Sequence, residues 1–404
     1  MHILLATTGY PPEHAGAGGR LHAMYRRLTA GNSSFTWSVM TKRRNAVAVE
    51  VAGPRQIFAF PRGEHEFSPA LEGLSEAVWM RRRLAKGLLD SVDVVHAAGW
   101  SWATPILVQA ARRRGIPIVR ELTTPGDPGS NSLGGRFIRW INRQADEIVA
   151  ISPALEQAAR RAAPNVPIWC RPNGVDTNRF CPADNDKRAR GRAALREWLP
   201  GLKVDDVVVL QIGRIRPLKN QLFLAESVAR LPAKFHLLFI GPVYHSDDSY
   251  VAALRRRLAE PDLRSRVALI EDAIPDVERF MQAADILAFP SAAEGLGTVM
   301  IEALCCGLPV VASRLPGVTD WVVSDGENGF LAPLDREQFA ARLTDAEALI
   351  SSQARIAAAA GKSYDQGNMD AGYRELFERL HAHREDAGPD SSRSVRSGFL
   401  SQQG

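Results

Sequence analysis

The sequence predicts an α/β protein with two doubly wound parallel-sheet domains that face each other across a cleft. Short apolar runs alternate with longer amphipathic runs, which is typical of βαβ units. This pattern breaks near residues 180–203 and then resumes. The chain has 404 residues, more than one compact core usually accommodates. Ligands of such sheets bind at the carboxyl ends of the strands, so we expect functional residues there.

Strands are expected wherever a short apolar run is bounded by polar or turn-forming residues. In the first half these runs are "HILLATT", "DVVHAAG", "IPIVREL" and "EIVAIS". In the second half they are "VVVLQIG", "HLLFIG", "RVALI", "ADILAFP" and "LPVVAS". The amphipathic runs between them predict helices, among them "GGRLHAMYRRLTA", "ATPILVQAARRRG", "NQLFLAESVARL" and "TVMIEALCCG".

The break in the pattern is charged and begins with Cys-Pro, so we place the domain boundary there. The first domain is expected over residues 1–182 and the second over residues 183–365. A final helix is expected at about 366–385, and we expect it to pack on the first domain. Residues 386–404 are polar and rich in Ser and Gly, which predicts a disordered tail.

The composition and charge of the chain limit which cellular locations and which partners we expect. The formal net charge is +5, with the basic excess in the first half of the chain, so an anionic partner is one interpretation and biased arginine usage is another. The N-terminus resembles a strand more than a signal peptide, and no run of about 18 apolar residues occurs. The four cysteines lack the spacing of metal ligands. We expect reduced thiols, cytoplasmic localisation and no bound metal.

The stretch "EGLGTVMIE" combines two carboxylates with a glycine-rich turn that precedes a helix. Free N–H groups and the helix dipole favour an anion at such a turn. An ionised carboxylate only accepts hydrogen bonds, so Glu294 and Glu302 would face donors such as sugar and ribose hydroxyls. The alternative is a capping box formed by Ser291 and Glu294, with Gly295 and Gly297 inside the first helical turn.

Cations for a phosphate group follow the strand "VVVLQIG". Arg214 and Lys219 lie in "GRIRPLKN", where a guanidinium and an ammonium could neutralise a departing nucleoside diphosphate without a metal. A solvated surface loop is the alternative. In the first domain, Gly16, Gly18 and Gly19 follow the first strand without forming GxGxxG. They predict either a loop that admits a ligand or a simple turn.

These segments together resemble the retaining glycosyltransferases of family 4, which have the GT-B fold of two facing Rossmann-like domains. The resemblance covers most of the chain. It depends on "GAGG", "DVVHAAG", "RPNGVDTNRF", "GRIRPLKN", "EGLGTVMIE" and "CCGLPVVAS" followed by "DGENGFL". The last four together are highly specific, and any one alone is not.

The resemblance implies a nucleotide-diphosphate sugar donor, which is a substrate rather than a cofactor. Glu294 would contact the sugar hydroxyls, Glu302 would hold the ribose, and Arg214 and Lys219 would bind the diphosphate. Gly16 and its neighbours would approach the phosphates. The remaining donor-binding positions that it implies are Gly295, Leu296, Gly297 and Thr298 beside the sugar and phosphate, and Ile274 near the base.

The resemblance also implies a mechanism. The acceptor hydroxyl would attack from the face of the leaving group, the departing phosphate would help to take its proton, and the anomeric configuration would be retained without a metal. Arg214, Lys219 and Glu294 are the expected catalytic residues. UDP- or GDP-sugars are the expected donors, and a polysaccharide, glycolipid or other glycoconjugate is the expected acceptor.

One loop departs from the family pattern. Many members carry a histidine after the fourth strand of the first domain, where this chain has Arg120 and Glu121 in "IPIVRELTTPGD". Glu121 or Thr123 is therefore our candidate for a role in sugar choice. His96 also matches a family position, although a histidine that closes a strand end is the simpler interpretation.

Several features allow other functions. A non-catalytic sugar-nucleotide or polyanion-binding protein and a sugar-nucleotide epimerase are the alternatives to a transferase. Asp184-Asn185-Asp186 resembles a metal motif but lies in the charged break, so we assign it no metal. The basic amphipathic segments 79–89 and 137–143 fit either peripheral contact with an anionic membrane at the inner face of the cytoplasmic membrane or ordinary packed helices. No nucleic acid partner is expected.

Overall fold

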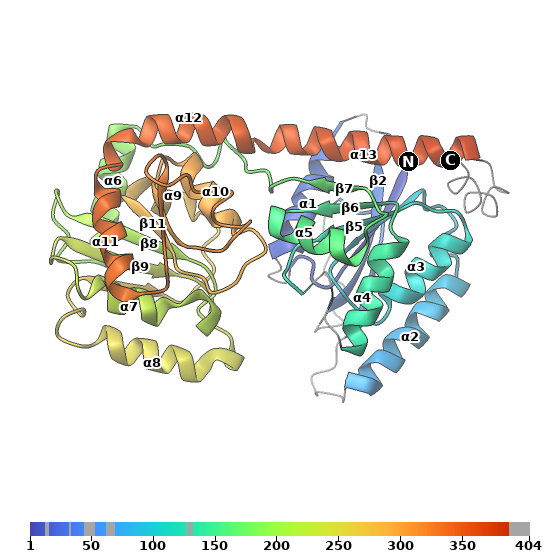
Figure 1. Ribbon diagram of the computed structural model, residues 1–404, viewed down its shortest axis with the longest axis horizontal. Helices are drawn as coiled ribbons and strands as arrows, with labels where there is room; N and C mark the ends of the chain where they lie inside the picture. The colour runs from blue at the N-terminus through green and yellow to red at the C-terminus, as the bar shows by residue number, and fades with distance from the viewer. Residues whose placement is uncertain are drawn as a thin grey trace, which may run out of the picture. The chain divides into compact units, whose positions relative to one another are not determined.

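The structure is a computed structural model that describes residues 1–12, 16–31, 34–43, 53–61, 69–126, 129 and 132–387. The chain forms two compact units (Figure 1). Unit 1 comprises Met1–Pro172 together with Met369–Gly404, and unit 2 comprises Asn173–Asn368. The division therefore follows Pro172, whereas the sequence suggested residue 182.

Residues 173–182 belong to unit 2 because their side chains and carbonyls bond to it. The amide of Asn173 donates to the Thr298 hydroxyl at 2.8 Å, and the Thr177 hydroxyl donates to Asp365 at 2.7 Å. The charged break that begins with Cys-Pro therefore does not separate the units, and the division instead follows Pro172.

Unit 1 contains a parallel sheet in the order β3-β2-β1-β4-β5-β6-β7. The order reverses between β1 and β4. β1 and β4 to β6 are buried along their length, which explains their continuous apolar sequences. The strands are β1 (His2–Thr7), β2 (Thr36–Arg43), β3 (Ile57–Pro61), β4 (Val94–Ala98), β5 (Ile118–Leu122), β6 (Glu147–Ala150) and β7 (Ile168–Cys170).

The helices of unit 1 are α1 (Gly16–Leu28), α2 (Pro69–Ala85), α3 (Thr104–Arg113), α4 (Leu133–Gln144) and α5 (Pro153–Ala162). Ser132 and Ser152 cap α4 and α5 by accepting bonds from Gly135 and Leu155. The C-terminal helix α13 (Gln366–Ala387) contributes Tyr373 and Phe377 to the same core as Tyr25 and Trp37.

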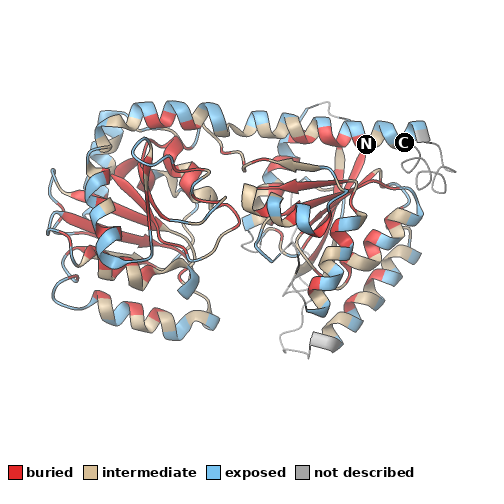
Figure 2. Ribbon diagram, viewed as in Figure 1, coloured by how far each residue is buried: buried red, intermediate tan, exposed pale blue. Residues whose placement is uncertain are grey.

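Unit 2 contains a parallel sheet in the order β10-β9-β8-β11-β12-β13, and here the order reverses between β8 and β11. The strands are β8 (Val207–Ile212), β9 (Phe235–Ile240), β10 (Val267–Ile270), β11 (Ile286–Phe289), β12 (Val310–Ser313) and β13 (Gly329–Ala332). The helices are α6 (Asn185–Leu195), α7 (Gln221–Val228), α8 (Asp248–Leu258), α9 (Glu278–Ala283), α10 (Thr298–Cys305), α11 (Arg336–Glu347) and α12 (Gln353–Tyr364). Figure 2 shows the central strands of both sheets as buried and the outer faces of the helices as exposed.

Every strand that the sequence predicted is present, as β1, β4 to β6 and β8 to β12. The others, β2, β3, β7 and β13, were not predicted. β3 and β7 are short edge strands, and β13 is a four-residue edge strand. β2 mixes polar and apolar residues in "TWSVMTKR", so its sequence does not show the continuous apolar run of the central strands.

The charged break expected at 180–203 instead contains helix α6. Asp184 caps this helix by accepting from the Lys187 N–H at 2.7 Å, which accounts for the first carboxylate of the Asp-Asn-Asp sequence. Arg188 and Arg192 of α6 bond to the carboxylate of Asp285 at 2.5 and 2.6 Å. The charged residues of this segment therefore hold helix α6 on unit 2 through ion pairs.

The final helix α13 was expected at 366–385 and extends to Ala387. Residues 386 and 387 of the expected tail are thus helical, and residues 388–404 lie outside the described residues. Among the described helices, none combines the length and apolar character that crossing a bilayer requires.

Candidate functional site

The predicted donor residues of unit 2 follow the adjacent strands β8 and β11. These strands pair in parallel through Val209 and Leu210, so their carboxyl ends lie at the same edge of the sheet. The strand order reverses between them, and the crevice at such a reversal is where open α/β sheets bind ligands.

Two hydrogen bonds hold the β8 and β11 loops together. The Asn220 side chain donates to the carbonyl of Pro290 at 2.7 Å, and the Ala292 N–H donates to the carbonyl of Leu218 at 2.9 Å. Asn220 has a φ of 56°, a left-handed conformation that asparagine tolerates better than most residues. The short 3₁₀ turn Pro217–Lys219 ends there, which places Lys219 beside the β11 loop.

Lys219 and Glu294 form an ion pair between the ammonium Nζ and the carboxylate Oε1. The side chains are 21% and 16% exposed, so both are partly desolvated and both remain accessible to a ligand. The ammonium also lies 5.4 Å from the centre of the Phe289 ring. The structure thus brings together one predicted phosphate-binding cation and the predicted sugar-binding carboxylate.

The start of α10 is shaped by Gly297. Its φ of 81° favours glycine, and a Cβ atom there would lie 2.6 Å from the Phe289 ring. The helix begins at Thr298, and no side chain of the described residues caps it. Its first N–H groups are therefore available to an anion.

This geometry shows that the capping-box alternative is wrong. Ser291 and Glu294 precede the helix start at Thr298 by several residues, so they cannot cap α10. Gly295 and Gly297 likewise precede the first turn and do not lie in it. Leu296 is buried between them.

Arg214 has different partners from those of Lys219. Its guanidinium bonds to Asp247 at 2.8 Å and to the Ser246 hydroxyl at 3.0 Å, and it lies 4.2 Å from the centre of the Tyr244 ring. The structure therefore holds Arg214 against the loop that follows β9, on the other side of β8 from β11. The two predicted cations are on one loop, but only Lys219 contacts Glu294.

Glu302 lies on α10 and is half-buried. Burial raises the pKa of its carboxyl to about 7, and the positive charge of Arg179 opposes this rise. Arg179 pairs with Glu278 at 2.7 Å and also donates to the carbonyl of Pro275. Ile274 directly precedes Pro275. Arg179 therefore interacts both with Glu302, the predicted ribose-binding residue, and with the turn predicted to border the base.

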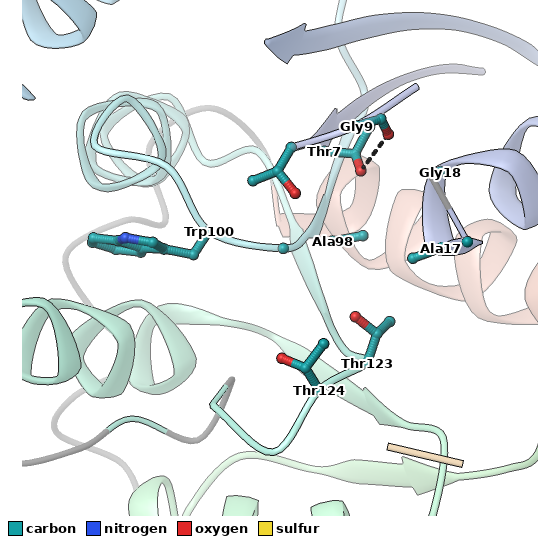
Figure 3. Close-up of a pocket in the computed structure, with 11 residues that line it drawn as sticks. Thr7, Gly9, Ala17, Gly18, Ala98, Trp100, Thr123 and Thr124 are labelled. Carbon is teal, nitrogen blue, oxygen red and sulfur yellow. Dashed lines mark hydrogen bonds between the residues drawn. The ribbon is translucent and has the colours of Figure 1, made fainter. Parts of the chain in front are cut away.

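Unit 1 contains a pocket of about 490 Å³ where β1, β4 and β5 end (Figure 3). It lies at the reversal between β1 and β4, the position equivalent to the β8–β11 edge of unit 2. All its described lining residues are uncharged: Thr7, Thr8, Gly9, Gly16, Ala17, Gly18, Ala98, Gly99, Trp100, Thr123 and Thr124.

Two of the three predicted glycines line this pocket, and they do so from a helix. Gly16 and Gly18 belong to the first turn of α1, whereas the sequence placed Gly16 in a loop and began the helix at Gly18. A Cβ at Gly18 would lie 1.9 Å from the Gly9 carbonyl oxygen, so the close approach of α1 to the β1 end requires glycine. Gly19 faces open space and is not part of the lining.

Glu121 does not line the pocket, whereas Thr123 does. The Glu121 carboxylate is buried, pairs with Arg20, accepts from the Tyr373 hydroxyl at 2.5 Å and lies 3.1 Å from His96 Nε2. Burial is the main cause that lowers the pKa of His96 to about 3, so this ring is neutral. Glu121 and His96 therefore form an internal polar network.

Arg120 is also structural. Its guanidinium donates to the carbonyl oxygens of Ala97 and Gly99 at 3.0 and 2.9 Å. These carbonyls belong to the segment that carries Ala98 and Gly99 into the pocket wall. Arg120 therefore holds the β4 end in place and is not part of the pocket lining.

The sequence analysis assigned no role to Asn173, Arg179, Asp247 or Trp100, and of the pocket threonines it named Thr123 alone. Asn173 and Arg179 lie in "RPNGVDTNRF", which carried the resemblance without assigned functions. The paired threonines directly after the apolar runs "HILLA" and "IVREL" were a usable signal, because polar residues at the ends of parallel strands face the ligand edge. Asp247 and Trp100 carried no such signal.

Two doubly wound sheets, each with a candidate site at its reversal point, define the GT-B class of α/β proteins. Residues 16–179 match the model of Glycosyltransferase Family 4, and residues 206–347 match that of Glycosyl transferases group 1. The chain belongs to this glycosyltransferase family, as the sequence motifs predicted.

Relatives support this assignment. A D-inositol 3-phosphate glycosyltransferase of Rhodococcus opacus is 34% identical over 340 residues, which cover 79% of this chain and 71% of the relative. One from Acidothermus cellulolyticus is 29% identical over 259 residues, which cover 59% of this chain and 56% of the relative. The chain thus spans little more than half the length of the latter relative.

Solved structures confirm the fold. HepE from Anabaena in complex with UDP has a TM-score of 0.73 at 21% identity, covering 94% of this chain and 100% of that chain. Sucrose-phosphate synthase from Thermosynechococcus elongatus has a TM-score of 0.79 at 19% identity, covering 95% and 99%. At these identities the likeness concerns the fold alone.

Proposed function

We propose that this chain is a retaining glycosyltransferase that moves a sugar from a UDP- or GDP-sugar to a hydroxyl group of a glycan or lipid-linked acceptor. The observation that carries the proposal is the Lys219–Glu294 pair at the β8–β11 edge, beside the uncapped start of α10. A cation, free N–H groups and an acceptor-only carboxylate match a diphosphate joined to a hydroxyl-rich sugar. Membership of a glycosyltransferase family supports it.

In this proposal the donor binds to unit 2. The diphosphate takes the Lys219 ammonium and the N–H groups at the start of α10, with Arg214 as the second cation. Glu294, released from Lys219, accepts hydrogen bonds from sugar hydroxyls. The exchange replaces one ion pair with another, so the cation is never left without a counter-charge. HepE bound to UDP has the same fold, which supports a uridine nucleotide as the first donor to test.

The nucleoside end of the donor lies near Glu302 and Ile274 in this proposal. The Glu302 carboxylate accepts from the ribose hydroxyls, and the backbone around Ile274 and Pro275 borders the base. Arg179 supports both groups, because it contacts Pro275 and its charge acts on Glu302. This assigns Arg179 a positioning role.

The transfer forms a bond between the acceptor oxygen and the anomeric carbon while the bond from that carbon to the diphosphate oxygen breaks. The proton of the acceptor hydroxyl goes to an oxygen of the departing diphosphate. Negative charge develops on this leaving group, and Lys219 and Arg214 stabilise it where it forms. Attack from the leaving group's own face retains the anomeric configuration.

The acceptor head group occupies the pocket of unit 1 in this proposal. Its volume of about 490 Å³ is within the ordinary range for a small-molecule site. Its threonine hydroxyls, backbone groups and Trp100 face are suited to a polyol. The described lining is uncharged, which favours a neutral hydroxyl-rich group over a phosphorylated one.

Incubation with labelled UDP-, GDP- and ADP-sugars tests the proposal. We expect slow hydrolysis or transfer with one donor, and Lys219→Ala should lower the rate by roughly 10²–10³-fold, the usual effect of removing one group that stabilises the leaving charge. Lys234→Ala is the matched control, because Lys234 forms an exposed ion pair with Glu347 in the same unit.

Three results contradict this proposal. Binding of nucleotide sugars without any turnover favours a non-catalytic binding protein. Conversion of the donor into an epimeric nucleotide sugar favours an epimerase. A Lys219→Ala variant with the same rate as Lys234→Ala removes the assigned role of the β8–β11 edge.

A further inference from the structure

Helices α2 and α4 carry apolar side chains that unit 1 leaves exposed. Leu74 is 64% exposed and Leu133 is 63% exposed, far more than core residues of the same type. Within each helix the exposed apolar residues recur at intervals of three and four, so they form one stripe per helix. The exposed members are Leu71, Leu74 and Val78 on α2, and Leu133, Phe137 and Trp140 on α4.

Trp102 joins the two stripes into a single surface. Helices α2 and α4 both pack against α3, and Figure 1 shows the three helices alongside one another. A Cβ at Gly73 of α2 would lie 3.2 Å from the Trp102 ring, and the Phe137 ring of α4 meets the same ring edge-on at 6.0 Å. We call this surface the apolar face; it consists of Leu71, Leu74, Val78, Trp102, Leu133, Phe137 and Trp140.

The apolar face is continuous with the pocket of unit 1. Trp100 lines the pocket, and in Figure 3 its indole lies on the side opposite Ala17 and Gly18. The Trp100 and Trp102 rings meet edge-on at 5.5 Å, and Trp102 then meets Phe137. Three aromatic rings therefore lead from the pocket wall to the exposed stripe of α4.

The charge around the apolar face is positive. Arg81 and Arg82 of α2 and Arg136 and Arg143 of α4 are exposed. The sequence of α4 contains no acidic residue, and Glu72 and Glu76 of α2 both pair with Lys42. Apolar and aromatic side chains bordered by arginines match the interface of an anionic lipid bilayer.

We propose that the apolar face docks on an anionic lipid bilayer, and that the acceptor is a lipid-linked molecule. Its polar head occupies the unit 1 pocket, and its apolar chain passes along Trp100, Trp102 and Phe137. This inference rests on the proposed transferase function and specifies its acceptor class. A second copy of the chain fits the face less well, because it would bring two sets of arginines together.

Sedimentation of the full chain with lipid vesicles tests this inference. The wild-type chain should bind vesicles of phosphatidylcholine and phosphatidylglycerol, and bind pure phosphatidylcholine vesicles more weakly. The double variant Leu74→Glu, Leu133→Glu should lose roughly tenfold or more in vesicle affinity, because two anchoring side chains become charged. Val204→Glu is the matched control, since Val204 is 78% exposed on unit 2.

The contribution of charge is tested separately. Arg82→Glu and Arg136→Glu should each lower affinity for the anionic vesicles about fivefold, and added salt should reduce this difference. Arg256→Glu, an exposed arginine on α8 of unit 2, is the control and should bind as the wild type does.

The acceptor class has its own measurement. With a labelled donor and a membrane extract as the acceptor source, label should enter the organic-solvent phase, and the Leu74→Glu, Leu133→Glu variant should reduce it. Label confined to the aqueous phase would overturn the assignment of a lipid-linked acceptor.

A shift in melting temperature with UDP separates this inference from the proposed function. The surface variants should keep the wild-type UDP shift, since they lie in unit 1. If the wild-type chain shows this shift but stays in solution with anionic vesicles, the inference fails and the proposed function stands. The inference also fails if the Leu74→Glu, Leu133→Glu variant binds vesicles as well as Val204→Glu does. It fails too if the wild-type chain forms a dimer that this variant dissociates while vesicle binding stays unchanged, because the apolar face would then bind a second copy of the chain.

Discussion

At the scale of single residues, the candidate donor site is built from charges that already have partners. Lys219 is bound to Glu294, and Arg214 is bound to Asp247. Each pair keeps a long, flexible cation in one conformation before a ligand arrives. Because the cations are already ordered, less side-chain conformational entropy is lost when a ligand binds.

Glu302 leads to a prediction about pH. Its folded-state pKa of about 7 lies above the ordinary value of 4.5. A raised carboxyl pKa favours the folded state at low pH, and this contribution is lost as the pH rises from about 4.5 through 7. We expect Glu302→Gln to be more stable than the wild type above pH 7 and to show a flatter stability profile. Thermal unfolding across this pH range measures the difference.

The same carboxyl connects pH to the proposed ligand. Since ribose hydroxyls donate to the ionised form, UDP affinity should rise with pH through about 7 in the wild type. Glu302→Gln should show weaker binding that hardly depends on pH in this range. A wild-type affinity that is constant or falls with increasing pH would contradict the assigned role of Glu302.

At the scale of secondary-structure elements, glycine determines how closely α1 approaches the end of β1. Gly18 packs against the Gly9 carbonyl, whereas Gly19, one residue later in the same helix, faces open space. The two positions have similar sequence surroundings, and only the three-dimensional packing distinguishes them. They therefore provide a matched pair of substitutions.

We expect Gly18→Ala to destabilise unit 1 by about 1–3 kcal/mol, the usual cost of forcing an extra methyl into a packed position. Gly19→Ala should instead stabilise it by up to about 1 kcal/mol, because alanine favours the helix more than glycine does. Chemical denaturation of the two variants beside the wild type measures both values. Equal effects at the two positions would show that α1 does not pack on Gly9 as described.

The elements also show which parts of the fold the sequence could predict. Central strands such as β4 and β9 are buried on both faces, so their apolar runs were easy to identify. The edge strands β3, β7 and β13 are short, and a four-residue apolar run in a loop looks the same in sequence. Helix α6 was missed because its stability comes from Arg188 and Arg192 bonding to Asp285, which lies 97 and 93 residues later in the chain.

At the scale of the whole molecule, the site could be predicted only in part. Lys219 and Glu294 were identified because each follows a central strand, and parallel strands place their ends together. The burial of Glu121 could not be predicted, because its partners Arg20 and Tyr373 come from α1 and α13, and Tyr373 lies 252 residues further along the chain. Such contacts depend on the completed fold.

The two units should differ in how they fold alone. A fragment of residues 173–368 contains all of unit 2, so it should unfold cooperatively and be stabilised by UDP by roughly 2.7 kcal/mol at 100 times its dissociation constant. A fragment of residues 1–172 lacks Tyr373 and Phe377; in the core of unit 1 the Phe377 ring stacks with those of Tyr25 and Tyr373. We expect it to lack a cooperative transition, and calorimetry of both fragments measures this.

The composition of unit 1 from both ends of the chain also determines the order in which the protein can mature on the ribosome. Domains generally form in the order in which they are made, with the N-terminal domain first. Here the segment that completes the core of unit 1 is translated only after all of unit 2 has been made. Unit 2 can therefore fold before α13 has been synthesised. During the synthesis of unit 2, the nascent chain exposes the part of the unit 1 core that α13 later covers. That core therefore stays uncovered by Tyr373 and Phe377 until α13 has been translated.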